Sequence, residues 1–173
     1  GSFYRNFLSK GEREIPLSRE VLIVKDYLSI QKLRYGYILN DEYDIADDTK
    51  NILVPRLILQ PLVENCIYHG IRPKGEEGAI KITSRLSGEK LILTVRDTGV
   101  GMTKEQIDKI LSSEKQSEEE LGSESFGLWG TIERVRYYTG REDICRIESE
   151  IGEYTEIRLN RVLRHCKKNK IKY

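Results

Sequence analysis

Two runs of alternating apolar and polar residues, joined by a short turn, constrain the fold of this chain most strongly. Alternation with a period of two is typical of strands with one buried face. Residues 87–89 (SGE) supply a turn between the runs, so the sequence predicts an antiparallel hairpin over residues 80–95. The apolar members of the two runs are Ile80, Ile82, Leu86, Leu91, Leu93 and Val95.

The remaining patterns predict helices and a second hairpin around this one. Helical spacing of apolar residues predicts helices over residues 17–34, 54–69, 102–111 and 128–138, and further strands are predicted over 37–45, 144–149 and 154–159. Pro61 is expected to open or kink the second helix. Residues 112–125 are nearly all polar and are expected to remain unordered. The order predicts an α+β fold, a two-layer sandwich whose mixed, mainly antiparallel sheet has helices on one face.

Composition indicates one domain and no special partner. The chain has 173 residues, 38% of them hydrophobic, which is enough for one ordinary core. The net charge of +1 gives no reason to expect nucleic acid binding. Three cysteines without a CxxC pair argue against a disulfide framework or a zinc knuckle. No apolar run reaches the roughly 20 residues that span a bilayer.

Asp97 is the first candidate site residue. It has the same parity as Leu93 and Val95 and therefore lies at the end of a core-facing row. A buried carboxylate needs donors, and a base with an exocyclic amine would supply one. Residues 97–101 (DTGVG) leave the strand through Gly99 and Gly101, which allow the backbone to approach a flat ligand. The alternative is an ordinary turn that ends a strand.

A second group of candidates lies on the helix predicted before residue 70. Asn65 and His69 lie on the apolar side of this helix. The Asn65 amide oxygen suits Mg²⁺, which binds a few protein oxygens together with substrate phosphates. Glu64 points about 100° around the helix and can reach solvent or the water shell of the metal. Alternatively, His69 is a hydrogen-bonded core residue and Asn65 caps a loop.

The third group, residues 126–130 (FGLWG) with Gly122 before them, opens a helix after the polar segment. Free backbone amides at a helix start attract anions, and glycines let a phosphate come close. The alternative is a linker that meets a capped helix.

Taken in chain order, residues 60–65 (QPLVEN), 97–101 (DTGVG) and 127–130 (GLWG) resemble the N, G1 and G2 boxes of the Bergerat-fold ATPases, which include histidine kinases, gyrase, the Hsp90 chaperones and the MutL proteins. The closer resemblance is to sensor histidine kinases of the LytS/YesM type. It extends to about residue 160, and it rests on residues 15–17 (IPL), 27–36 (YLSIQKLRYG), 59–65 (LQPLVEN), 69–70 (HG), 97–101 (DTGVG), 127–130 (GLWG) and 133–134 (ER).

The resemblance implies a role for each candidate in binding ATP and Mg²⁺. Asn65 would hold the metal, and Asp97 would accept from the adenine amine with Gly99 and Gly101 beside the base. His69 would pack on the nucleotide. Residues 112–126 would form the ATP lid. The remaining implied ligands are Gly127, Leu128 and Gly130 over the phosphates and Thr155 in the water network of the adenine.

The sequence also departs from the family pattern. Tyr68 stands where relatives often have a lysine, Ser125 replaces a glycine, and Gly130 stands where an asparagine is usual. The phosphoacceptor histidine of the family lies upstream, and neither His69 nor His165 has its Pro-His-Phe setting. The implied activity is therefore transfer of the ATP γ-phosphoryl group to a histidine outside this fragment, with Glu64 assisting. Alternatives are a hydrolytic ATPase and a nucleotide-binding pseudokinase.

The resemblance also implies an organisation and partners. Residues 1–16 would end a dimerisation region, with Gly1 and Ser2 typical of a cleaved tag. Residues 17–160 would be the ATP-binding domain, and 161–173 a basic tail. Expected partners are a phosphoacceptor domain of the same or a second protomer and a response regulator, in a homodimeric protein without nucleic acid. The expected location is the cytoplasmic side of a membrane sensor.

Overall fold

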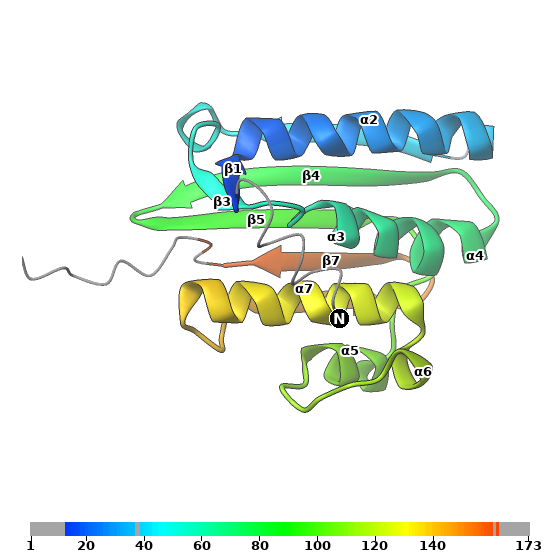
Figure 1. The fold of residues 1–173 in the computed structure, drawn as a ribbon. Helices are drawn as coiled ribbons and strands as arrows, with labels where there is room; N and C mark the ends of the chain where they lie inside the picture. Colours follow the sequence, from blue (N-terminus) through cyan, green and yellow to red (C-terminus); the bar gives the residue numbers. More distant parts are fainter. Residues whose placement is uncertain (1–12, 37–38, 161, 163–173) are drawn as a thin grey trace, which may run out of the picture.

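The computed structural model describes residues 13–36, 39–160 and 162. A five-stranded sheet has the order β2-β4-β5-β7-β6 (Figure 1). Its strands are β2 (Leu39–Ile45), β4 (Gly78–Ser87), β5 (Lys90–Asp97), β6 (Cys145–Glu150) and β7 (Tyr154–Leu159). β2 pairs with β4 in parallel and the other pairs are antiparallel. The predicted mixed sheet and both hairpins are confirmed.

Helices cover one face of this sheet, as predicted (Figure 1). Helix α2 (Leu17–Tyr35) buries Leu17, Val21, Val24 and Leu28 on its apolar side. Beside it, residues 60–74 form a continuous helical rod, which is followed by α7. Helix α5 lies at the lower edge of the view. The helical elements after α2 are α3 (Gln60–Asn65), the π-helix η3 (Cys66–Ile71), α4 (Arg72–Lys74), α5 (Lys104–Leu111), α6 (Glu118–Leu121) and α7 (Ser123–Thr139).

The predicted start of the second helix at residue 54 is wrong. A short strand β3 (Leu53–Pro55) pairs there with β1 (Glu14–Pro16). β1 lies within residues 1–16, for which the resemblance implies the end of a dimerisation region. A 3-10 turn η2 (Asp47–Thr49) precedes β3 in the predicted loop. Leu57 then has a φ of 56°, which interrupts any helix before Gln60. Pro61 lies in the first turn of α3, so it opens the helix and does not kink it.

The expectation of an unordered segment over residues 112–125 is also corrected. Ser117 and Glu120 form a capping box that starts α6, so local hydrogen bonds order what apolar burial cannot. α7 begins at Ser123, before the predicted start at residue 128. The Trp129 indole also donates to the carbonyl of Ser112 at 2.9 Å. The polar segment is thus held by the hydrogen bond from Trp129 at its first residue, Ser112, and its last residues form the first turn of α7.

The core lies between the helical layer and the sheet. Leu62 and Ile67 face it from the helical rod and Ile58 from the segment just before it, and Val95 and Ile157 face it from the central strands. Among the residues that the structure describes, no helix has the combination of length and apolar character needed to cross a membrane. The basic tail lies outside the described residues except for Val162.

Candidate functional site

Asp97 ends β5 as a buried carboxylate, and its side chain is 1% exposed. The N–H of Gly99 donates to its Oδ1 at 2.8 Å. Burial raises the pKa of Asp97 to about 6, although the hydrogen bond from Gly99 and the neighbouring Cys66 thiol oppose the shift. Burial also raises the pKa of the Cys66 thiol well above its usual range, so the thiol stays protonated. A carboxylate with spare acceptor capacity therefore lies at the strand end.

Thr155 lies directly opposite Asp97 in the β5–β7 register and is buried. Its hydroxyl is 2.9 Å from the hydroxyl of Ser149, which accepts from the N–H of Met102 at 2.7 Å. The structure places Thr155, a ligand that the resemblance implies, beside the predicted base-binding carboxylate. Polar hydroxyl groups therefore adjoin Asp97 on the sheet side.

The glycines after Asp97 are required by the chain's own backbone. A Cβ on Gly99 would lie 2.2 Å from the carbonyl carbon of Gly70. Gly101 has a φ of 79°, and a Cβ there would lie 2.5 Å from the carbonyl oxygen of Glu150. The N–H of Val100 donates to the Gly70 carbonyl at 3.1 Å. This loop is thus packed between η3 and the β6–β7 turn, a constraint that the sequence did not reveal.

Asn65 is the last residue of α3 and is 1% exposed. Its Oδ1 is buried and has no hydrogen-bond partner among the described residues. An unpaired buried amide oxygen is costly unless a ligand completes it. The π-helix η3 continues directly from Asn65, and a Cβ on Gly70 of η3 would lie 2.6 Å from Asp97 Oδ1, so the helical segment that begins with α3 meets the end of β5. The structure therefore brings the two most important predicted residues into one region.

Glu64 and His69 lie on the same helical rod. Glu64 is half-buried and accepts from the Gln60 side chain at 3.0 Å. His69 is also half-buried, and its Nε2 is 3.3 Å from the hydroxyl of Ser125 in the first turn of α7. The imidazole therefore joins the rod to the start of α7, at the end of the predicted lid.

Gly127, Leu128 and Gly130 lie inside α7, not in an open loop. Leu128 is fully buried in the core. Within a helix the backbone N–H groups donate to carbonyls of the preceding turn, so only the first-turn amides are free for an anion. In this structure the free amides therefore lie earlier, at the Ser123 end of α7.

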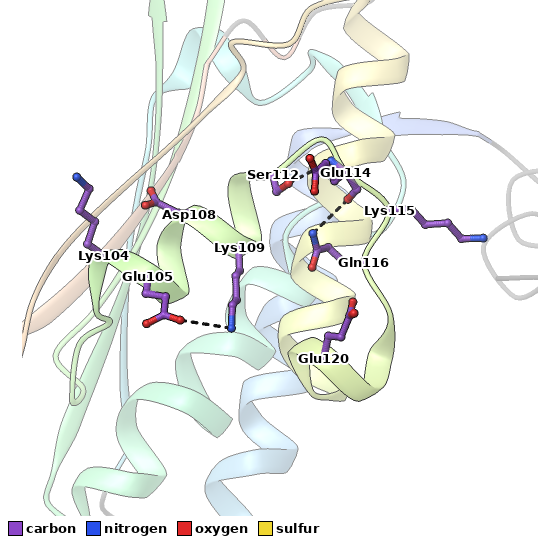
Figure 2. Close-up of a pocket in the computed structure, with 9 residues that line it drawn as sticks. All are labelled: Lys104, Glu105, Asp108, Lys109, Ser112, Glu114, Lys115, Gln116 and Glu120. Atoms are coloured by element: carbon purple, nitrogen blue, oxygen red, sulfur yellow. Dashed lines mark hydrogen bonds and ion pairs between the residues drawn. The ribbon is translucent and has the colours of Figure 1, made fainter.

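A separate hollow of about 960 Å³ lies between α5 and the segment that follows it (Figure 2). None of the predicted metal, base or phosphate ligands lines it, although part of its lining belongs to the predicted lid, residues 112–126. Charges of both signs face it, so it attracts neither anions nor cations strongly. Its lining residues are Lys104, Glu105, Asp108, Lys109, Ser112, Glu114, Lys115, Gln116 and Glu120.

Two charged residues that sequence reasoning gave no role hold the start of α3. Glu20 is fully buried on α2 and accepts from the N–H groups of Leu57 at 2.6 Å and Leu59 at 3.4 Å. Arg134 of α7 donates to the Leu57 carbonyl at 3.0 Å and to that of Arg56. Glu20 lies three residues after Leu17 and four before Val24, so its place on an apolar helix face was the available signal.

A family model described as histidine kinase-, DNA gyrase B-, and HSP90-like ATPase matches residues 51–166. The chain belongs to this ATPase family. The match includes Asn65, Asp97 and the start of α7, and it confirms the resemblance seen in the sequence. Membership supports ATP binding by the domain.

Two curated relatives are named as sensor histidine kinases. The chain is 34% identical over 152 residues to sensor histidine kinase YpdA of Escherichia coli (strain K12), covering 86% of this chain and 26% of the relative. It is 32% identical over 157 residues to sensor histidine kinase YesM of Bacillus subtilis (strain 168), covering 91% of this chain and 25% of the relative. The chain thus spans about a quarter of the length of these relatives.

The fold agrees with this membership. The catalytic domain of histidine kinase ThkA superposes with a TM-score of 0.59 at 18% identity, covering 87% of this chain and 97% of that one. The predicted ATP-binding fold is confirmed.

Proposed function

We propose that this chain is the ATP-binding catalytic domain of a sensor histidine kinase, which transfers the γ-phosphoryl group of ATP to a histidine outside the fragment. The supporting observation is the meeting of α3 and β5. There, α3 ends at Asn65, whose buried amide oxygen has no hydrogen-bond partner among the described residues, and η3, which follows Asn65, packs against the buried Asp97 carboxylate. ATP requires a cation at its phosphates, which Asn65 could hold, and a hydrogen-bond acceptor for its base amine, which Asp97 could provide.

Mg²⁺ fits the Asn65 end of this region. Among the described residues, no group of three or more His, Cys, Asp or Glu side chains is placed to hold a metal. A Mg²⁺ site of one protein oxygen plus phosphates and waters needs no such group. Asn65 would hold this ion through Oδ1, and the bound ion would supply charge neutralisation for the phosphates.

The base end would be read by Asp97. Its carboxylate would accept from the adenine amine, while Thr155 and Gly99 fix its surroundings and His69 packs near the nucleotide. Gly101, Gly127, Leu128 and Gly130 remain predicted contributors through backbone placement. The free amides at the Ser123 end of α7 are the nearest donors that the helix leaves available for phosphate oxygens.

Glu64 is proposed to orient or deprotonate the incoming imidazole. Its carboxylate is half-buried on α3 next to Asn65, and Gln60 holds one oxygen at 3.0 Å. A general base must reach the proton that it removes, and the position of Glu64 next to the proposed metal ligand supports this role.

Partners and location follow from the relatives and are also proposals. A phosphoacceptor segment of the same or a second protomer would supply the histidine, and a response regulator would receive the phosphoryl group. The domain would lie on the cytoplasmic side of a longer, dimeric membrane sensor.

Calorimetric titration with a non-hydrolysable ATP analogue tests the proposal. The unmodified chain is expected to bind the analogue more tightly with Mg²⁺ than without it. Asn65→Ala should remove the Mg²⁺ dependence, and Asp97→Asn should weaken binding at least about tenfold in both conditions, since it removes a charged acceptor. Absence of binding by the unmodified chain, or full affinity in Asp97→Asn, would overturn the assignment.

A further inference from the structure

A row of three polar side chains crosses the sheet at the end of β5. Asp97 lies opposite Thr155 of β7, and Thr155 lies opposite Ser149 of β6. Residues that are opposite each other in antiparallel strands share a face, and their Cβ atoms are about 4.5–5.5 Å apart. The hydroxyl of Thr155 is therefore within reach of both neighbours, and it can serve only one of them with its single hydrogen.

We propose that Ser149 is a positioning residue for base recognition, which takes the hydroxyl hydrogen of Thr155 and thereby keeps the Asp97 carboxylate open to a base amine. This inference rests on the proposed function, in which Asp97 accepts from the base. Sequence reasoning gave Ser149 no role.

The hydrogen bonds of Ser149 decide which of the two hydroxyls donates to the other. Ser149 Oγ donates to the carbonyl of Tyr154 at 2.7 Å and accepts from the N–H of Met102 at 2.7 Å. Its third partner is Thr155 Oγ1 at 2.9 Å. A hydroxyl has one hydrogen and two lone pairs, and the hydrogen of Ser149 is already used. Thr155 is therefore the donor in this pair, and the three partners fill the capacity of the Ser149 hydroxyl.

One oxygen of the Asp97 carboxylate is used by the chain itself. The N–H of Gly99 donates to Oδ1 at 2.8 Å, and Gly70 packs so closely that a Cβ there would lie 2.6 Å from this oxygen. A base amine would therefore bind at Oδ2. Without Ser149, the Thr155 hydroxyl could turn to Oδ2, because a hydrogen bond to a charged acceptor would replace the one it lost.

Occupation of Oδ2 by Thr155 would affect two classes of purine differently. A 6-amino group needs the acceptor that Thr155 would then occupy. A 6-oxo group cannot donate, so it gains nothing from an open carboxylate. Loss of the Ser149 hydroxyl should therefore weaken binding of 6-amino nucleotides and leave binding of 6-oxo nucleotides nearly unchanged.

The test compares ADP with IDP, which differ at the base and share the same diphosphate. Both are titrated calorimetrically at fixed Mg²⁺ into the unmodified chain, Ser149→Ala and Ser149→Thr. Ser149→Ala should weaken ADP about three- to tenfold, the usual effect of one lost hydrogen bond to a charged group, and lower the ADP-to-IDP affinity ratio by a similar factor. Ser149→Thr keeps the hydroxyl and should keep the ratio.

A double-mutant cycle shows whether Ser149 acts through Thr155. Thr155→Val has no hydroxyl that could reach the carboxylate, so adding Ser149→Ala to it should change the ratio less than about twofold. Ser84→Ala is the matched control, because it also removes a serine hydroxyl that pairs with a threonine, Thr49, at 2.6 Å. Ser84 lies on β4, four residues along from the partner of Asp97, and its loss should leave the ratio unchanged.

Several outcomes would overturn the inference. Among them are an unchanged ratio in folded Ser149→Ala, equal weakening of ADP and IDP, and a ratio that falls as far in Ser84→Ala or in Ser149→Thr. An equal effect of Ser149→Ala in the Thr155→Val chain would overturn it too, because Ser149 would then act through Met102 or through packing. If Ser149→Ala does not fold, Ser149→Cys takes its place, since a thiol is only a weak hydrogen-bonding group. Failure of the proposed function is recognised separately, because the unmodified chain would then bind neither nucleotide.

Discussion

Gly99 packs so tightly against Gly70 that a methyl group on Gly99 would lie 2.2 Å from the Gly70 carbonyl carbon. Backbone atoms cannot yield as side-chain ends do, so Gly99→Ala must shift the loop after β5 or the helical rod. We expect a loss of about 2–4 kcal/mol in the free energy of unfolding, measured by urea titration. Gly130→Ala is the matched control, since nothing lies within 4 Å of its added Cβ. In a helix it should gain up to about 1 kcal/mol. Equal stability of the two variants would contradict this packing.

Asp97→Asn should bind nucleotide poorly and yet be more stable at neutral pH. Burial raises the pKa of Asp97 from 3.8 to about 6, so the native state holds this proton more tightly than the unfolded chain. The favourable contribution is full below about pH 4 and is lost as pH rises through about 6. The variant should therefore gain about 1–3 kcal/mol at pH 7, and its stability should fall less between these pH values.

Urea unfolding across pH 4.5 to 7.5 measures this difference. Asp108→Asn, which changes an exposed carboxylate of α5, is the control and should follow the unmodified chain. If the stability of Asp97→Asn depends on pH in the same way as that of the unmodified chain, other groups cause the pH dependence. Buried Glu20 is the first candidate, because its burial raises its pKa.

Trp129 should report nucleotide binding by its fluorescence. It is the single tryptophan of the chain, it donates to Ser112 at the start of the predicted lid, and its ring stacks on Phe126 with centroids 5.6 Å apart. Movement of the lid onto a nucleotide would change both contacts. Addition of the Mg²⁺-bound ATP analogue should therefore shift or quench the emission, with no change in Asp97→Asn at the same concentration. Calorimetric saturation without any change in emission would show that this end of the lid stays in place.

Glu64 and Asn65 should separate chemistry from binding in a longer chain that carries the phosphoacceptor histidine. Glu64→Gln should leave ATP affinity nearly unchanged and slow phosphoryl transfer about a hundredfold, the lower range for loss of a general base. Asn65→Ala should reduce both quantities. The measurements are calorimetry and single-turnover formation of acid-labile phosphate.

Glu119→Gln, an exposed change on α6, is the control. An unchanged transfer rate in Glu64→Gln would remove Glu64 from the mechanism.

The sequence predicted the parts of the fold that depend on periodicity. Parity along β5 correctly placed Asp97 toward the core, and helical spacing correctly placed Asn65 on a buried side. Both inferences use only neighbours along the chain. The local pattern alone therefore identifies the helix that carries Asn65 and the strand that ends at Asp97.

Features that depend on distant contacts were not predictable in this way. β1 and β3 are three residues each and contain prolines, so neither has a periodic signal. The contact of Gly70 with Asp97 and Gly99 joins the π-helix η3 to the end of β5, and no local pattern indicates it. The early start of α7 reflects contacts of Ser125 and Trp129 with other elements, which a polar local sequence does not reveal.

Because residues Cys66–Ile71 form a π-helix, the number of residues from Asn65 to Gly70 fixes the side of the helical rod on which each of them lies. Each residue advances an α-helix by about 100° and the wider π-helix by somewhat less, so removing one residue between them would turn everything beyond it to another side of the rod. Gly70 would move away from Gly99, while Asn65 would stay at the end of α3. A turn such as residues 87–89 can change length without this reorientation. Insertions and deletions are therefore expected to be tolerated in that turn and not within Cys66–Ile71.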